Sequence, residues 1–175
     1  VSITGSLAKA DSDATTRAYV TGCGGTVTRN TTVLTDTISK ADADIKMPTV
    51  AVAFGNIGIA VINAHADGTA ASFVDTTGAA ETPSLGALTV TTNAKTIAKA
   101  KTAPGGKFSL RVSGINYSNN MAMASASLKA ASYVKGAFNA GDTAVTSTAN
   151  TKTDASVGEA LLKVDVVNLA TNQAI

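Results

Sequence analysis

Apolar and polar or small side chains alternate at every second position over most of the chain. The alternation is clearest at residues 49–54, 88–92 and 121–128. A period of two residues places successive side chains on opposite faces of a β-strand. The Ala-rich stretches could form helices on propensity alone, but they lack a 3.6-residue period and are interleaved with Thr, Ser and Val, which favour strands. The pattern therefore predicts an all-β protein.

Turn-forming residues separate the alternating segments. They cluster at residues 21–25, 103–106 and 139–142; all three clusters contain Gly, with Pro in the second and Asn and Asp in the third. These residue types accept the backbone angles that bend or reverse a chain. We expect the strands to end at these clusters.

The alternating segments repeat along the chain. Residues 52–74 and 112–134 align without a gap at a spacing of 60, and residues 3–20 align 54 positions upstream. All three segments end in an aromatic residue followed by Val, and the aromatic residues are Tyr19, Phe73 and Tyr133. A glycine follows each pair, at Gly22, Gly78 and Gly136. Self-similarity at this spacing is the signature of a repeat architecture.

The Thr-rich segments that follow these repeats also correspond to one another. They start at Gly24, Leu85 and Gly141, after which residues 158–168 parallel residues 106–116 at a spacing of 52. We predict one repeat domain, residues 1–175, with internal units at roughly 1–54, 55–114 and 115–175. Both ends fall within a unit. We therefore expect this to be a piece of a longer array, or a subunit that neighbouring copies complete.

A unit of 52–60 residues suits about two coils of a parallel β-solenoid. We expect four or five short strands per unit, with equivalent strands stacked at about 4.8 Å. Small inward residues fit the narrow interior of such a coil, and Tyr19, Phe73 and Tyr133 would stack or plug one corner of successive coils. The alternative is a β-sandwich, which would call for a thicker core with more Leu, Phe and Trp.

Composition narrows the possible functions. Only 15% of residues are charged and the net charge is +2, so there is no basic field for nucleic acid or an anionic membrane. The longest apolar run, residues 57–62, is far shorter than the roughly 20 residues that span a bilayer. We therefore expect neither nucleic-acid binding nor membrane insertion. Val1 lacks the charged and apolar regions of a signal peptide, so we expect a mature or excised chain.

With these motifs in view, the chain resembles the β-strand-repeat region of large bacterial filamentous surface adhesins of the autotransporter and leukotoxin type. The blocks that carry the resemblance are residues 58–66, which lead to Phe73 and Val74, and residues 86–92. The resemblance covers nearly the whole chain at the level of pattern. It implies a right-handed parallel β-solenoid displayed extracellularly on the cell surface, and it carries over no catalytic residues.

We therefore predict a non-catalytic structural or adhesive module, with end-to-end stacking into filaments as a further expectation. Its partners would be copies of itself or neighbouring repeats. The alternative is a module that binds a glycan or a host protein, for which Tyr117 and Tyr133 are the candidate contacts. A third hypothesis, a β-helix polysaccharide lyase or hydrolase, needs charged groups converging on one face, and the chain offers few.

Individual candidate residues point to no enzyme, metal or cofactor site. The one histidine, His65, aligns with Asp11 and Ser125 in the repeat and is expected to be an outward polar residue. Cys23 lies in a Gly-rich turn, cannot form an internal disulfide and has no histidine close to it in sequence. With one His and one Cys, a zinc site would need grouped carboxylates, and none are suitably grouped.

Acidic residues occur in pairs two positions apart, which places both carboxylates of a pair on one strand face. The pairs are Asp11 with Asp13 and Asp42 with Asp44. Such pairs can bind calcium or act in glycosidases, but a solvated face that discourages unwanted strand pairing is the simpler interpretation.

The remaining motifs have simple interpretations too. Residues 22–25 and 55–58 lack the Lys-Ser/Thr and the strand-to-helix context of a phosphate loop. Lys95, Lys99 and Lys101 are expected to form a solvated basic edge. The sequons at Asn30 and Asn116 are expected to be unmodified. The threonine pairs at residues 89 and 91, and 146 and 148, are too irregular for an ice-binding ladder.

Overall fold

The computed structural model describes residues 2–22, 24–26, 29–47, 50–104, 110–158 and 162–175, and within them the protein is all-β. It contains no helix there, and so none long and apolar enough to cross a membrane. The strands are β1 (Ser2–Thr21), β2 (Thr31–Met47), β3 (Val50–Asp75), β4 (Ser84–Leu85), β5 (Leu88–Pro104), β6 (Leu110–Lys135), β7 (Asn139–Ala140), β8 (Thr143–Val157) and β9 (Leu162–Ala174).

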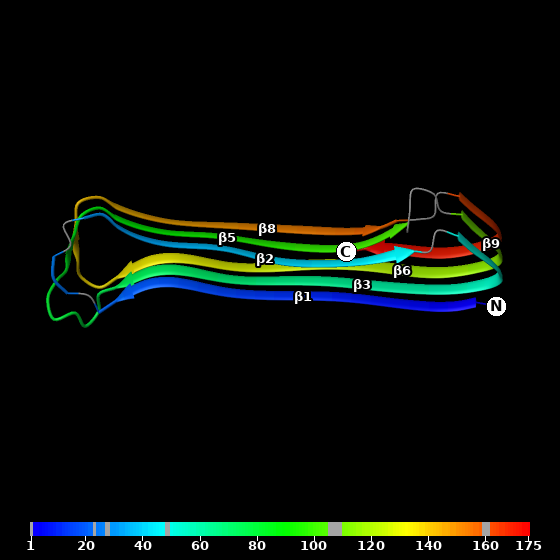
Figure 1. The fold of residues 1–175 in the computed structure, drawn as a ribbon, viewed down its shortest axis with the longest axis horizontal. Coiled ribbons are helices and arrows are strands. Elements are labelled where there is room, and N and C mark those ends of the chain that lie inside the picture. The colour runs from blue at the N-terminus through cyan, green and yellow to red at the C-terminus, as the bar shows by residue number, and fades with distance from the viewer. Residues whose placement is uncertain (1, 23, 27–28, 48–49, 105–109, 159–161) are drawn as a thin grey trace.

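The strands form a parallel β-solenoid. Among the described residues, one sheet has the order β1-β3-β6-β9, a second has β2-β5-β8, and β4 pairs with β7. Every one of these pairings is parallel. The long strands run the length of the molecule, and the chain crosses between the two main sheets at its ends (Figure 1). The β-sandwich alternative is excluded in its Greek-key form, because such a sandwich is built from antiparallel strands.

The strand register reproduces the repeat alignment. Ser2 lies beside Asn56, a spacing of 54, and Val50 lies beside Leu110, a spacing of 60. Leu110 in turn lies beside Leu162, a spacing of 52. These are the three spacings that the sequence predicts, so each repeat unit stacks directly on the one before it.

The expected number of coils per unit is wrong. Each unit forms one coil, not two, because its strands are long: β3 and β6 each run for 26 residues. Internal glycines such as Gly5, Gly58 and Gly68 do not interrupt the strands. Ala, Ser, Thr and Gly all fit an extended backbone within a sheet, so glycines with an extended backbone do not end these strands.

The core between the two main sheets is built from small side chains. Alternate residues of β3 and β5 are buried, and the larger buried cluster is formed by Ala41, Ala43, Ile62, Ala64, Ala66, Ala98, Ala100 and Ala122. A second cluster contains larger residues and lies near the C-terminal ends of β1 and β3. It is formed by Val33, Val74, Leu88 and Val90. Burial of these apolar surfaces supplies most of the stabilisation.

Inward hydroxyls, buried at Ser72, Thr35 and Thr92 and half-buried at Ser132, link the two sheets in a repeating contact. Ser72 Oγ lies 2.8 Å from Thr35 Oγ1 and 2.7 Å from the carbonyl oxygen of Thr91. One coil further along, Ser132 Oγ lies 2.9 Å from Thr92 Oγ1 and 2.6 Å from the carbonyl oxygen of Thr146. Buried hydroxyls are tolerated when they are hydrogen-bonded, so this contact holds the sheets together without an apolar side chain.

The corners after β1, β3 and β6 depend on glycine. Gly22, Gly78 and Gly136 have φ values of 64°, 84° and 95°, in the region that side-chain-bearing residues rarely adopt. They are the glycines that follow the aromatic-Val pair in each repeat. At Gly136 the backbone also packs tightly, since Thr76 Oγ1 donates to the carbonyl oxygen of Ala137 at 2.8 Å.

Candidate functional site

The outer face of the sheet β1-β3-β6-β9 carries the main candidate groups. Odd-numbered residues of β1, of β3 from Ile57 and of β6 from Ile115 point outward and even-numbered ones inward, as the alternating burial shows. Each outward position forms a column across neighbouring strands because the register spacings are even. We call this surface the outer face of the first sheet.

Three aromatic rings stack in one such column. The ring centroids of Tyr19 and Phe73 are 5.2 Å apart with planes 8° apart, and those of Phe73 and Tyr133 are 4.8 Å apart with planes 3° apart. The predicted stack is therefore confirmed. It lies on the outer face, with Tyr19 and Tyr133 exposed, so it does not plug the interior.

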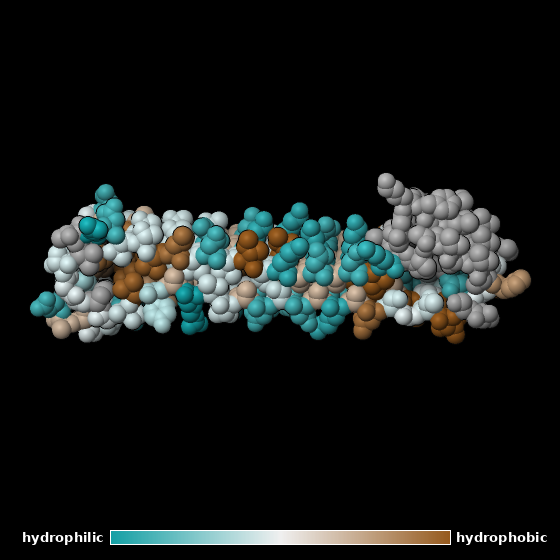
Figure 2. All heavy atoms as spheres, viewed as in Figure 1, coloured by the Kyte–Doolittle hydropathy of each residue, from teal (hydrophilic) through white to brown (hydrophobic). Residues whose placement is uncertain are grey.

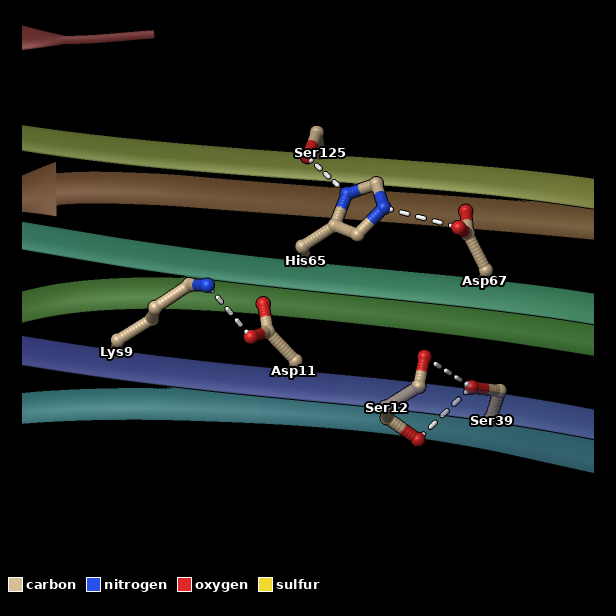
Figure 3. A network of polar contacts seen from close by, with 7 residues as sticks. All are labelled: Lys9, Asp11, Ser12, Ser39, His65, Asp67 and Ser125. Atoms are coloured by element: carbon tan, nitrogen blue, oxygen red, sulfur yellow. Dashed lines mark hydrogen bonds and ion pairs between the residues drawn. The ribbon is translucent and has the colours of Figure 1, made fainter.

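His65 holds a hydrogen-bonded network on the same face (Figure 3). Its Nε2 lies 2.9 Å from Asp67 Oδ2, and its Nδ1 lies 2.6 Å from Ser125 Oγ. A carboxylate only accepts hydrogen bonds, so the Nε2 proton faces Asp67, and in the neutral ring Nδ1 accepts the Ser125 hydroxyl proton. His65 pairs in register with Asp11 and Ser125 and its side chain is 44% exposed, as the repeat alignment predicts.

The carboxylate–imidazole–hydroxyl connectivity is the one that serine hydrolases use to activate a nucleophile. Acyl transfer also needs donors that converge on an oxyanion and a site that holds the substrate. Ser125 projects from a regular parallel sheet, whose N–H groups point within the sheet plane toward neighbouring strands. The network therefore fixes the orientation of three polar side chains, and we assign it no reaction.

The acidic pairs are outward on both main sheets. Asp11 Oδ2 lies 2.8 Å from Lys9 Nζ, and Asp42 Oδ2 lies 3.4 Å from Lys40 Nζ. In the part of the chain that the structure describes, no group of three or more His, Cys, Asp and Glu side chains is placed to hold a metal ion. Each of these two acids thus has an exposed ion pair along its own strand.

The three lysines Lys95, Lys99 and Lys101 do not form an edge. They lie on β5, the central strand of the sheet β2-β5-β8. In register, Lys99 lies between Asp42 and Asp154, and Lys101 lies between Asp44 and Ser156. The sequence places these lysines on one face but does not show which distant strands flank them, which is why the expectation of an edge is wrong.

The two sequon asparagines form hydrogen bonds within the fold, and one of the glycine-containing motifs lies inside a strand. Asn116 is buried, and its Oδ1 accepts a hydrogen bond from Asn56 Nδ2 at 3.2 Å; Asn30 Oδ1 accepts one from the Ala87 N–H, also at 3.2 Å. Residues 55–58 lie inside β3, so they form no loop for a phosphate. Cys23 lies outside the described residues.

The threonine pairs do not build a regular ladder. Thr91 lies beside Thr146, but Leu34 lies on its other side, and Thr89 lies beside Ala144. An ice-binding surface would need Thr to recur across the strands, and here apolar and small residues interrupt it.

Among the carboxylates that the structure describes, Asp75 has a lowered pKa. Hydrogen bonds from the Thr77 hydroxyl and N–H, the latter 2.9 Å from Asp75 Oδ1, hold the pKa of Asp75 below its usual range. Lys135 Nζ, 3.7 Å from Asp75 Oδ2, acts in the same direction. Asp75 and Thr77 belong to the corner after β3, so this interaction stabilises a turn.

A further feature was not recognised from the sequence. Ile3, Ile57, Tyr117 and Leu169 occupy one register position on four neighbouring strands, and all four are exposed. The repeat spacings of 54, 60 and 52 already align these residues, but the alternation alone does not show which face of each strand is exposed.

Fold and surface together define an all-β parallel solenoid with long flat faces. Comparisons with known protein families, with curated proteins and with solved structures find no match. The resemblance to filamentous adhesins thus stays a prediction, and the functional argument depends on the geometry.

Proposed function

We propose that this chain is a non-catalytic structural and adhesive repeat module of a bacterial surface protein, displayed outside the cell and extended by end-to-end stacking of coils. One observation carries the proposal: the coils stack in register through flat, uninterrupted strands. A stack of coils built this way can be extended along the solenoid axis, across the strands, by adding coils, which suits a filament or stalk.

The outermost strands support such extension. Within the described residues, β1 pairs only with β3 and β8 pairs only with β5, so each carries backbone N–H and C=O groups open to another strand. Long flat edges of this kind template the addition of further strands. Those strands would come from neighbouring repeats of the same protein or from a second copy.

A substitution in β1 can block this edge without disturbing the fold. The Gly22 N–H donates to the carbonyl oxygen of Asp75. Even-numbered N–H groups of β1 therefore point toward β3, and odd-numbered ones point to the open edge of the sheet. Proline in place of Thr15 removes only an N–H that points to the open edge, and proline is tolerated on edge strands. Valine at the same position keeps the N–H and serves as the matched control.

Negative-stain electron microscopy over a concentration series tests the proposal. The unmodified chain and Thr15→Val should form rods that lengthen with concentration, whereas Thr15→Pro should remain short. Isolated particles of constant length for the unmodified chain at every concentration would overturn end-to-end assembly.

The second candidate function is recognition of a glycan or a host protein. Tyr117 and Tyr133 favour it, because both side chains are exposed on the outer face of the first sheet. Binding on a glycan array that is lost in Tyr117→Ala would support this function, and an array without hits would count against glycan recognition.

A further inference from the structure

Seven exposed side chains form an apolar patch on the outer face of the first sheet. They come from β1, β3, β6 and β9 and are Ile3, Leu7, Ile57, Ile59, Ile115, Tyr117 and Leu169. Four adjacent columns of the face contribute, and the other members whose side chains are described are uncharged: Gly5, Gly55, Val61, Asn119, Met121, Thr171 and Gln173. Hydrophobic side chains are visible at the end of the molecule near the N-terminus (Figure 2).

The patch is large for a solenoid of this size. A fully exposed large apolar side chain presents on the order of 150–200 Å², so the exposed fractions of these seven residues, from 38% to 77%, amount to roughly 700 Å². The largest patch on a typical monomer is about 300–600 Å². Each partner in a standard protein–protein interface buries about 800 Å². The patch therefore has the area that one side of a dimer needs.

Charged residues begin where the patch ends. The next three columns along the strands contain Lys9, Asp11 and Asp13, and the columns of Asp11 and Asp13 also hold His65 and Asp67. A partner that covered the whole face would bury these groups at high cost. A partner that covers only this end of the strands leaves them in water.

We propose that the patch is a side-to-side interface with a second copy of this chain. The outer faces of the two first sheets pack about 10 Å apart, as in stacked sheets, around a two-fold axis that passes through the patch. Such an axis makes the interface self-complementary, so the same apolar side chains serve both copies. The two rods then overlap at one end and extend in opposite directions.

The chemistry around the patch favours a second copy over a lipid surface. Membrane-surface binding gains from a basic rim that attracts anionic lipids. Among the side chains that the structure describes, the nearest cation along β1 is Lys9, which is paired with Asp11 at 2.8 Å, and Asp13 adds a further negative charge. The patch itself is uncharged and apolar, and the described residues at its border along β1 are neutral overall or acidic. It can therefore pack against the same patch on a second copy without attraction to anionic lipids.

This contact is independent of the proposed end-to-end assembly, because it uses outward side chains and not strand edges. Thr15→Pro blocks the strand edge, so sedimentation velocity on this variant over a concentration series measures the side-to-side contact alone. If the variant fails to fold, the same measurement is made on the unmodified chain at low concentration. A concentration-dependent dimer is expected. If the unmodified chain forms this dimer but no filaments, only the proposed function is overturned.

Substitutions locate the interface. Ile57→Lys and Tyr117→Lys should each weaken dimerisation at least tenfold, because they place a charge at its centre. Ile38→Lys is the matched control: Ile38 is also exposed, but it lies on β2 in the other sheet, and this variant should dimerise like the parent. Circular dichroism should be unchanged in all three, since each side chain points outward.

Three results would overturn the proposal. The chain could be monomeric over the full concentration range, or Ile38→Lys could weaken the dimer as much as the patch variants do. The third is flotation with phosphatidylcholine vesicles in the absence of any dimer, which would assign the patch to a lipid surface.

Discussion

Single glycines shape the corners that follow β1, β3 and β6. The glycines after the aromatic-Val pairs share a positive φ, but their surroundings differ. A Cβ at Gly22 would meet nothing within 4 Å, whereas a Cβ at Gly136 would overlap Thr76. The same substitution at the two positions therefore separates backbone strain from steric overlap.

Gly136→Ala is expected to destabilise the protein more than Gly22→Ala. Both substitutions force a side chain into a positive φ, which costs about 1–2 kcal/mol, and Gly136→Ala also displaces Thr76 and its hydrogen bond to the Ala137 carbonyl. Chemical denaturation of the two variants measures the difference. Equal losses of stability would mean that the corner relaxes around the new methyl group.

Asp75 links stability to pH. Its folded pKa lies below the usual value, so the ionised form stabilises the fold at pH values above about 4, the unfolded pKa. That contribution is lost as the pH falls through the folded pKa. Asp75→Asn should thus be less stable than the parent at pH 7, with the difference shrinking on acidification.

Thermal unfolding of the parent and Asp75→Asn between about pH 7 and pH 3 measures this linkage. Thr77→Val is the matched variant: it removes the hydroxyl but keeps the N–H that donates to Asp75, so its pH profile should fall between the other two. Parallel profiles for the parent and Asp75→Asn would contradict the assignment.

At the scale of elements, long parallel strands gain stability from columns of like side chains. Phe73 stacks on both Tyr19 and Tyr133, whereas each tyrosine has one stacked neighbour among the described rings. Aromatic pairs contribute about 0.5–1.5 kcal/mol beyond the area that they bury. The central ring should therefore matter most.

Phe73→Leu is expected to cost about 1–3 kcal/mol, roughly twice the cost of Tyr19→Leu. Phe54→Leu is the control, since Phe54 is 96% exposed and should change stability little. Denaturation midpoints of the three variants test this order. If Phe73→Leu costs no more than Phe54→Leu, the stack does not contribute to stability.

The element scale also shows how far the sequence was informative. The even spacing of the repeats predicted the columns, including the aromatic stack and the alignment of Asp11, His65 and Ser125. The hydrogen bonds from His65 to Asp67 and Ser125 could not be predicted, because side-chain orientations depend on neighbours 60 residues away.

At the scale of the whole molecule, the length of the strands makes the single chain elongated along the strand direction (Figure 1). Residues 55–75 of β3 alone span about 70 Å at ~3.3 Å per residue. A compact protein with the same number of residues has a radius of gyration of about 16 Å. Figure 1 shows the strands running along the full length of the molecule.

Small-angle X-ray scattering at high dilution should therefore give a maximum dimension above about 70 Å and a radius of gyration above 20 Å, roughly a rod's value. The Tyr117→Lys variant is the better sample, because it should not dimerise through the apolar patch. A radius of gyration close to 16 Å would be incompatible with the stacked coils.

The sequence by itself determined the strands, the spacings of 54, 60 and 52 residues between neighbours, and the columns that follow from them. These depend on the two-residue period of an extended backbone and on the similarity between repeat units, and both can be read from the linear sequence. The tertiary structure alone decided that each unit is a single coil, that Lys99 lies between two strands, and that Ile57 and Tyr117 face solvent. Ala, Ser and Thr fit either side of a strand, so only the packing of the two sheets determines which alternate residues become the core.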